Sequence, residues 1–258
     1  MTDPHTPKPK PAAPWKNVLS QANITTALAV FAVVLAGAPY VVPQVQSFVA
    51  EKGLMNRPDI LESASLKLSD QKQLAATKAL QAGVKSHHDS LFNDKADPIL
   101  GDPKAPIKIV EFLDYNCGYC RASTPVLKAF LAKNPDVAVI VKEYPVINQN
   151  SRPLAAFALG AAQTGHYADL HYALMTETIS SEAEMTDLLT KTGLDPETVK
   201  AHAASDEVQA QIDKVLQLGS DIGVTGTPTF IIGDKVIDGA KMDELKAAVV
   251  AQRSAKPS

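Results

Sequence analysis

The sequence contains few of the residues that mark several common classes of protein. Its 258 residues include two cysteines, one tryptophan and only 5% aromatic residues. Two cysteines are too few for a disulfide-stabilised scaffold. The 25 basic and 28 acidic side chains give a formal net charge of −3, so a basic nucleic-acid-binding surface is not expected. The 45% hydrophobic content is enough to bury one good core with an additional segment.

Charged residues are absent from residues 24–42, an apolar run of about 19 residues that is long enough to span a bilayer. It follows a Pro- and Lys-rich tail, residues 1–22, that we expect to be disordered and cytoplasmic. We therefore interpret segment 23–43 as a membrane anchor. The alternative is a secretory signal cut after Ala36-Gly37-Ala38, although Pro39 would then follow the cut. Either interpretation places the rest of the chain outside the cytoplasm.

Residues 44–96 have the composition of a helical arm or linker. Two helices are expected, at residues 57–68 and 69–92, with Pro58-Asp59 at the start of the first. Apolar residues recur at a loose helical spacing without a clean heptad. Two interpretations follow: a spacer that separates the next domain from the membrane, or an arm that forms a homo-oligomer through residues 58–92.

The remaining chain predicts an α/β domain with a helical block inside it. Strand 107–113, helix 117–133 and strand 137–142 indicate a right-handed parallel β–α–β unit. Four short helices with capping signals follow, and then a helix, an antiparallel hairpin and a last helix. The expected boundaries are a first α/β part at 97–150, the helical insertion at 151–205, a second α/β part at 206–252 and a disordered tail at 253–258.

Both cysteines lie in one Cys-x-x-Cys motif at the junction of a strand and a helix. At a helix N-terminus, free backbone N–H groups and the helix dipole favour a thiolate. We therefore interpret Cys117 as the exposed attacking thiol and Cys120, one turn later, as the inward thiol that resolves a mixed disulfide. Gly118 and Tyr119 between them are expected to tune the redox potential. A zinc site would need two further ligands, and no metal is expected.

Four separated stretches accompany this element order. They are Leu91-Phe-Asn-Asp94, Phe112-Leu-Asp-Tyr-Asn-Cys-Gly-Tyr-Cys-Arg121, Lys142-Glu-Tyr-Pro145 and Gly223-Val-Thr-Gly-Thr-Pro-Thr-Phe230. With them the chain resembles the DsbA-like thiol–disulfide oxidoreductases of bacterial envelopes, and most closely their ScsC-like branch. The resemblance covers about residues 58–252. It implies a thioredoxin fold with an inserted α-helical domain, preceded by a membrane-spanning or signal helix and a helical arm.

The resemblance also implies further site residues. Pro228 is expected to have a cis peptide bond and to face the cysteines, with Thr227 presenting its backbone to an extended substrate. The alternative is an ordinary proline at the start of a strand. Glu111 and Lys142 are charges inside apolar strands, where a charge is costly unless it is paired. We interpret them as a pair that relays a proton and tunes Cys120; the alternative is that each reaches solvent at a strand end.

The functional hypothesis is a periplasmic protein disulfide oxidoreductase or isomerase with a redox-active Cys117–Cys120 disulfide and no cofactor. Unfolded or disulfide-bearing envelope proteins and a membrane redox partner are the expected partners. Tyr115, Tyr119 and Phe230 are expected to line an apolar surface for these clients. The alternative, from a different class, is a Cu(I)-binding protein of copper tolerance, because two thiolates are soft ligands. The five methionines are scattered, which makes this alternative weaker.

Overall fold

The computed structural model describes residues 26, 28–34, 36 and 58–255. The chain divides into two compact units, Met1–Asp70 and Gln71–Ser258. Within the first unit, residues 26, 28–34 and 36 are helical and exposed. Much of the anchor expected at 24–42 lies outside the described residues, as does the tail expected at 1–22. Of the tail expected at 253–258, residues 253–255 are helical as the end of the last helix, and residues 256–258 lie outside the described residues. No helix in the described part of the chain is long and apolar enough to cross a bilayer.

The arm contains one long helix, α3 (Pro58–Ser86), and a short helix, α4 (His88–Phe92). The sequence predicted a boundary between two helices at residues 68 and 69, and this prediction is wrong. After Pro58 the next Pro or Gly is Gly83, so nothing in this stretch interrupts the backbone hydrogen bonding of a helix. The long helix is therefore continuous to Ser86.

A five-stranded mixed sheet lies at the centre of the second unit, with the strand order β1-β3-β2-β4-β5. Its strands are β1 (Ile99–Gly101), β2 (Ile107–Leu113), β3 (Val137–Glu143), β4 (Thr229–Ile232) and β5 (Lys235–Asp238). β2 and β3 are parallel and are joined by helix α5 (Gly118–Lys133), which confirms the predicted β–α–β unit. β4 pairs antiparallel with both β2 and β5, so the predicted hairpin is also confirmed.

Strand β1 was not predicted. Its three residues pair antiparallel with β3, where Ile99 lies opposite Ile140. On either side are the turn clusters 93–98 and 101–106, so the sequence presents a loop with no strand periodicity. The strand exists because the edge of β3 supplies its hydrogen-bonding partners, and that is a tertiary contact that local sequence does not encode.

The two faces of the sheet carry separate cores because side chains alternate between faces along each strand. On one face, Ile109 and Val139 pack with α5 and with α11 (Met242–Ala255). On the other face, Val110, Phe112 and Ile140 pack with the end of α3, with α4 and with α10 (Asp206–Ile222). Residues of one strand that differ by a single position therefore lie in different surroundings.

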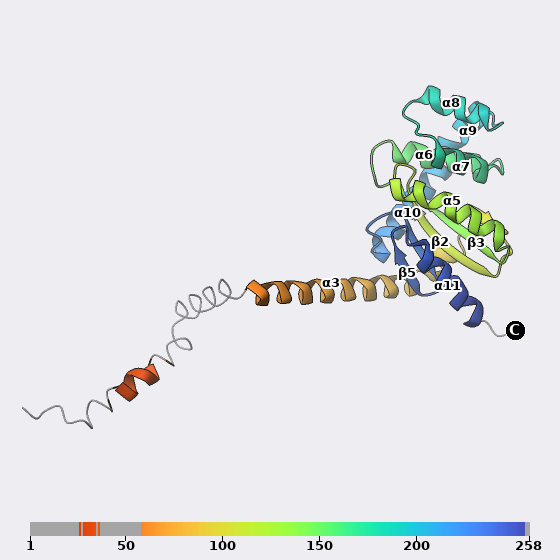
Figure 1. Ribbon diagram of the computed structural model, residues 1–258. Helices are drawn as coiled ribbons and strands as arrows, with labels where there is room; N and C mark the ends of the chain where they lie inside the picture. Colours follow the sequence, from red (N-terminus) through yellow and green to blue (C-terminus); the bar gives the residue numbers. More distant parts are fainter. Residues whose placement is uncertain (1–25, 27, 35, 37–57, 256–258) are drawn as a thin grey trace, which may run out of the picture. The chain divides into compact units, whose positions relative to one another are not determined.

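Four helices follow one another between β3 and α10, as the sequence predicts, and Figure 1 shows them gathered at one end of the sheet. They are α6 (Ser151–Ala162), α7 (Tyr167–Thr176), α8 (Glu182–Lys191) and α9 (Pro196–Ala203). The Ser181 hydroxyl accepts the N–H of Glu184 at 3.2 Å, and Asp195 accepts the N–H of Thr198 at 3.0 Å. These N-caps satisfy backbone donors at the starts of α8 and α9. The whole arrangement is the thioredoxin-like α/β fold that the resemblance implies.

Candidate active site

Cys117 is the N-cap residue of α5, directly after the turn that follows β2. Its carbonyl accepts the first helical hydrogen bond, from the N–H of Arg121 at 3.1 Å, and its side chain makes no capping hydrogen bond to the first turn. Both cysteines are free thiols. The Cys117 Sγ donates to the Thr227 carbonyl oxygen at 3.1 Å. Only 6% of Cys117 is exposed, so the prediction of an exposed thiol is wrong: the Thr227 loop lies against it.

Cys120 is completely buried, one turn further along α5, which confirms the predicted inward direction. Its backbone carbonyl accepts the hydroxyls of Ser123 at 3.0 Å and Thr124 at 2.8 Å. Burial raises the pKa of the Cys120 thiol, and the negative charge of Glu111 raises it further. Cys120 therefore favours the protonated thiol.

The Thr227–Pro228 peptide bond is cis, which confirms the prediction made for this loop. Pro228 is buried, and its carbonyl accepts the N–H of Gly239 at 2.8 Å. The Thr229 hydroxyl donates to the Gly226 carbonyl at 2.8 Å. These bonds hold the loop at the start of β4, where the Thr227 carbonyl meets the Cys117 sulfur.

Asp114, which the sequence analysis did not single out, holds the turn between β2 and α5. One carboxylate oxygen accepts the N–H of Asn116 at 2.8 Å, and the other accepts the N–H groups of Val146 and Ile147, both at 2.8 Å. The same side chain thus connects the cysteine turn to the loop after β3. An acid directly after a buried strand and before the Cys-x-x-Cys motif was the signal that could have identified it.

The surface around the cysteines differs from the predicted one. Tyr119 is 72% exposed, and Gly118 beside it is exposed too. Tyr115 and Phe230 are buried in the core, so the prediction that they line a client surface is wrong. The other exposed apolar side chains of this region belong to the loop after β3, at Val146 and Ile147, which are 45% and 48% exposed.

Glu111 lies in β2 on the face of the sheet that α5 covers, and it is 1% exposed. Burial raises the pKa of its carboxyl to about 8, with a further contribution from Glu143. Its Oε1 atom is buried without a hydrogen-bond partner. The carboxyl lies close enough to Cys120 for its charge to raise the pKa of that thiol.

The predicted pair between Glu111 and Lys142 is wrong. In the parallel register Glu111 lies opposite Val141, while Lys142 lies opposite Phe112. Because neighbouring positions alternate between faces, Glu111 faces α5, whereas Lys142 shares the opposite face with Phe112 and the core that packs on α4 and α10. The sheet itself separates the two charges.

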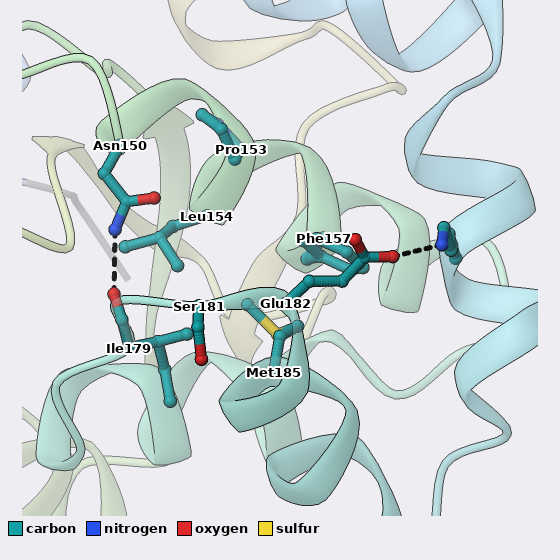
Figure 2. Close-up of a pocket in the computed structure, with 9 residues that line it drawn as sticks. Asn150, Pro153, Leu154, Phe157, Ile179, Ser181, Glu182 and Met185 are labelled. Atoms are coloured by element: carbon teal, nitrogen blue, oxygen red, sulfur yellow. Dashed lines mark hydrogen bonds and ion pairs between the residues drawn. The ribbon is translucent and has the colours of Figure 1, made fainter.

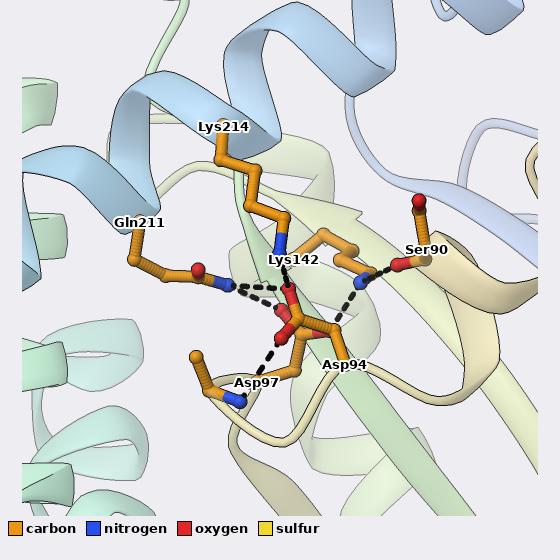
Figure 3. Close-up of polar contacts among 7 residues, drawn as sticks. Ser90, Asp94, Asp97, Lys142, Gln211 and Lys214 are labelled. Atoms are coloured by element: carbon orange, nitrogen blue, oxygen red, sulfur yellow. Dashed lines mark hydrogen bonds and ion pairs between the residues drawn. The ribbon is translucent and has the colours of Figure 1, made fainter.

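Lys142 belongs instead to a buried polar network on that opposite face (Figure 3). Its ammonium group forms an ion pair with Asp97 and donates to the Ser90 carbonyl at 2.6 Å. Gln211 of α10 donates to Asp97 at 2.9 Å and to Asp94 at 3.3 Å. Burial lowers the pKa of Lys142 and raises that of Asp97 to about 6, while the attraction between the two charges opposes both shifts.

A separate cavity of about 290 Å³ lies within the helical block (Figure 2). Leu154 and Phe157 of α6 face Met185 of α8 across it. Asn150 donates to the Ile179 carbonyl at 2.7 Å on one side. None of the residues that line this cavity belongs to the cysteine motif or the Thr227 loop, so it is a feature of the insertion and not of the dithiol site.

A dithiol at the start of the first βα helix, with a cis-proline loop against the first thiol, defines a thioredoxin-like protein with a thiol–disulfide exchange site. Comparisons with known proteins agree with this class. The family model described as DSBA-like thioredoxin domain matches residues 108–250. The chain is also similar to disulfide bond formation protein D of Bacillus subtilis, with 28% identity over 177 residues that cover 63% of this chain and 79% of that protein.

Two solved structures of Proteus mirabilis ScsC are also similar to this chain. The structure of the catalytic domain is 32% identical to this chain, with a TM-score of 0.60. The match covers 67% of this chain and 97% of the ScsC chain. The structure of a linker-deletion mutant is 26% identical to this chain, with a TM-score of 0.64. The match covers 93% of this chain and 100% of the mutant chain.

The chain therefore belongs to the DsbA-like thioredoxin family. Its likeness to the ScsC structures confirms the predicted resemblance to the ScsC-like branch, and its enzyme class is that of a protein disulfide oxidoreductase.

Proposed function

We propose that the protein is a periplasmic thiol–disulfide oxidoreductase for envelope proteins, with Cys117 as the nucleophile and Cys120 as the resolving thiol. One observation carries this proposal. The Cys117 sulfur lies at a helix N-cap, 3.1 Å from the Thr227 carbonyl, while Cys120 is completely buried one turn later. The first thiol is the one that retains some exposure to solvent and so meets a client, and the second is held inside to complete the exchange.

The exchange balances with these two thiols and a client. In the oxidised form, a client thiolate attacks the Cys117 sulfur, the Cys117–Cys120 bond breaks, and Cys120 leaves with the electron pair and takes up a proton. A second client thiolate then attacks the client's sulfur in the mixed disulfide and releases Cys117 as a thiolate. The client is oxidised by two electrons and the protein is reduced. The reverse sequence reduces a client disulfide.

Clients bind, in this proposal, at the exposed rim of the dithiol site. The backbone of Thr227, at the cis-Pro228 loop, pairs with an extended client segment as an added strand. Gly118 and Tyr119 offer an exposed contact surface on one side of Cys117, and Val146 and Ile147 add apolar side chains tied to the cysteine turn through Asp114.

Location and assembly follow from the N-terminal part of the sequence. An anchor or cleaved signal at residues 24–42 delivers the catalytic domain to the periplasm, where a membrane redox partner reoxidises or reduces the dithiol. The homo-oligomer is proposed through residues 58–92. In that range Leu61, Leu66, Leu68 and Leu74 of α3 are each more than half exposed, which leaves apolar surface for a second copy.

Cysteine variants test the assignment of the two thiols. Cys117→Ala is expected to abolish reduction and oxidation of a model disulfide protein. Cys120→Ala is expected to accumulate a covalent complex with the client through Cys117, visible by mass spectrometry. Exchange that persists in Cys117→Ala, or a trapped complex formed through Cys120, would overturn the assignment. Stoichiometric Cu(I) binding by a protein without disulfide exchange would instead favour the copper-binding alternative.

The mass of the full chain, measured beside refolding of a scrambled multi-disulfide protein, tests the link between assembly and isomerisation. An oligomer brings several thiol sites to one client, so an oligomer is expected to isomerise and a monomer to oxidise or reduce only. An inactive oligomer or an active monomer would break this link while leaving the roles of the two thiols intact.

A further inference from the structure

A second buried acid, Glu143, lies next to the dithiol site. It is the last residue of β3 and is 2% exposed. One of its two carboxyl oxygens, Oε1, accepts hydrogen bonds from two tyrosine hydroxyls. Tyr115 donates to it at 2.7 Å and Tyr167 of α7 at 2.6 Å. Its other oxygen is buried without a hydrogen-bond partner. The proposed exchange steps do not use this group, and the sequence analysis gave it no role.

Glu143 and Glu111 face the same side of the sheet. Glu143 lies opposite Leu113, and Glu111 lies two positions before Leu113 in β2, so the two carboxyls are diagonal neighbours on adjacent parallel strands. Both are under the helices that carry the cysteines and Tyr167. Two carboxyls that share a dry site cannot both ionise easily, so loss of a proton from one opposes loss from the other.

The contacts affect the two carboxyls differently. The pKa of each is raised to about 8, chiefly by burial; the tyrosine hydrogen bonds lower that of Glu143, and the charge of Glu143 raises that of Glu111. The tyrosine hydroxyls stabilise the carboxylate of Glu143, whereas Oε1 of Glu111 has no such donor. The negative charge of Glu143 therefore favours the protonated form of Glu111.

We propose that Glu143, held by Tyr115 and Tyr167, is a positioning residue that keeps the proton on Glu111 beneath Cys120. This proposal rests on the proposed function, in which Cys120 leaves as a thiolate and needs a proton. When the client thiolate breaks the Cys117–Cys120 bond, Glu111 gives its proton to the Cys120 sulfur and becomes a carboxylate. In the reverse direction that carboxylate takes the proton from Cys120 before it attacks the mixed disulfide.

Two cations lie near the residues that surround the acids: Arg121 donates to the Tyr115 carbonyl at 2.7 Å, and Lys128 lies over the Tyr172 ring. The titratable groups whose contacts or charges couple to them are Asp114 and Tyr115 from the turn, Cys120 from α5, and Tyr167 and Tyr172 from α7. His171 lies behind Tyr115, with Nδ1 3.1 Å from its hydroxyl, and burial lowers the pKa of His171 to about 3, so its ring is neutral. Among the described residues, no lysine or arginine shifts either carboxyl.

The pH profile of exchange tests the proposal. Glu143→Gln keeps the shape and the acceptor for the tyrosines but removes the charge. The rate at which a small dithiol reduces the Cys117–Cys120 disulfide is measured from about pH 5 to about pH 9, and its ratio to wild type removes the ionisation of the reductant. In Glu143→Gln, the alkaline loss of the rate is expected to begin about one pH unit lower, because Glu111 then loses its proton earlier.

Companion variants separate this role from a structural one. Tyr167→Phe removes one donor to Glu143, so it is expected to shift the profile in the same direction by less, and it provides a second test if Glu143→Gln does not fold. Glu111→Gln is expected to remove the alkaline loss of the rate altogether, and adding Glu143→Gln to it should not change the pH profile further. Glu207→Gln, a surface substitution at the start of α10, should leave the profile unchanged.

Two outcomes contradict different claims. A profile that moves in Glu111→Gln but not in Glu143→Gln or Tyr167→Phe overturns the role of Glu143 and leaves the proposed function standing. Exchange that persists in Cys117→Ala overturns the proposed function itself.

Discussion

Lys142 and Glu143 are neighbours in β3, but they lie on opposite faces of the sheet and in opposite electrostatic situations. Lys142 is completely buried with an ion-pair partner, Asp97, and a backbone acceptor at Ser90. Glu143 is also buried; among the described residues it has two tyrosine donors and no ion-pair partner, and Oε1 of Glu111 beside it has no hydrogen-bond partner.

The comparison indicates that an ion-paired, stabilising group and acids able to exchange a proton lie on opposite faces of one sheet. The buried Lys142–Asp97 ion pair and the Gln211 hydrogen bond connect β3 to the 93–98 loop and to α10. A buried acid without a cation keeps its proton into the neutral range and can therefore exchange it. The cysteines lie on the face with the unpaired acids.

Lys142→Met is expected to have the largest effect on stability. It removes the cation and leaves Asp97 buried without its partner, which costs about 3–5 kcal/mol of the free energy of unfolding. The measurement is urea unfolding at neutral pH, with the pH profile of disulfide exchange recorded on the folded variant. We expect the profile to keep its wild-type shape.

The double variant Lys142→Met with Asp97→Leu is the matched control. Removing both charges should recover most of the stability lost in the single variant, because no unpaired charge remains. If the double variant is no more stable than Lys142→Met, the ion pair is not the source of the effect.

Glu111→Leu is expected to have a smaller effect that depends on pH. In the folded chain the pKa of Glu111 is about 8, against an ordinary 4.5, so between these values the folded state holds a proton that the unfolded chain has released. The wild type therefore loses stability as the pH rises through this window. The stability of the variant relative to wild type should rise by about 2 kcal/mol between about pH 5 and about pH 7. A constant difference across this range, measured by urea unfolding of the reduced proteins, would show that Glu111 is not a buried, protonated acid.

Gln211→Leu is expected to have the smallest effect of the three. It removes the amide hydrogen bonds to the carboxylates of Asp97 and Asp94 while leaving the ion pair in place, which costs about 1–2 kcal/mol in urea unfolding. A loss as large as that of Lys142→Met would mean that the amide, and not the lysine, supports the carboxylates of this network.

Local patterns predicted most of the fold. The apolar run of β2, the Ser181 and Asp195 caps and the β4–β5 hairpin each carry their signal within a few residues. The short strand β1 and the unbroken α3 were missed. β1 depends on a distant partner strand, and the expected boundary in α3 had no helix-breaking residue behind it.

The site residues that belong to a sequence motif were predicted correctly, whereas the contacts that depend on the register of β2 and β3 were not. The cysteine pair and the cis bond before Pro228 follow from their motifs. The false pairing of Glu111 with Lys142 arose because both are charges in apolar strands, while the register that separates them appears only when β2 and β3 are aligned. Glu143 was passed over for the same reason, although it directly follows Lys142.

The most direct test of the account compares the pH dependence of disulfide reduction in the wild type, Glu111→Gln and Lys142→Met. We expect the wild-type rate to change around pH 8, Glu111→Gln to lose this change and Lys142→Met to retain it. An unchanged profile in Glu111→Gln, or the same loss in both variants, would contradict the assignment of chemistry to one face of the sheet.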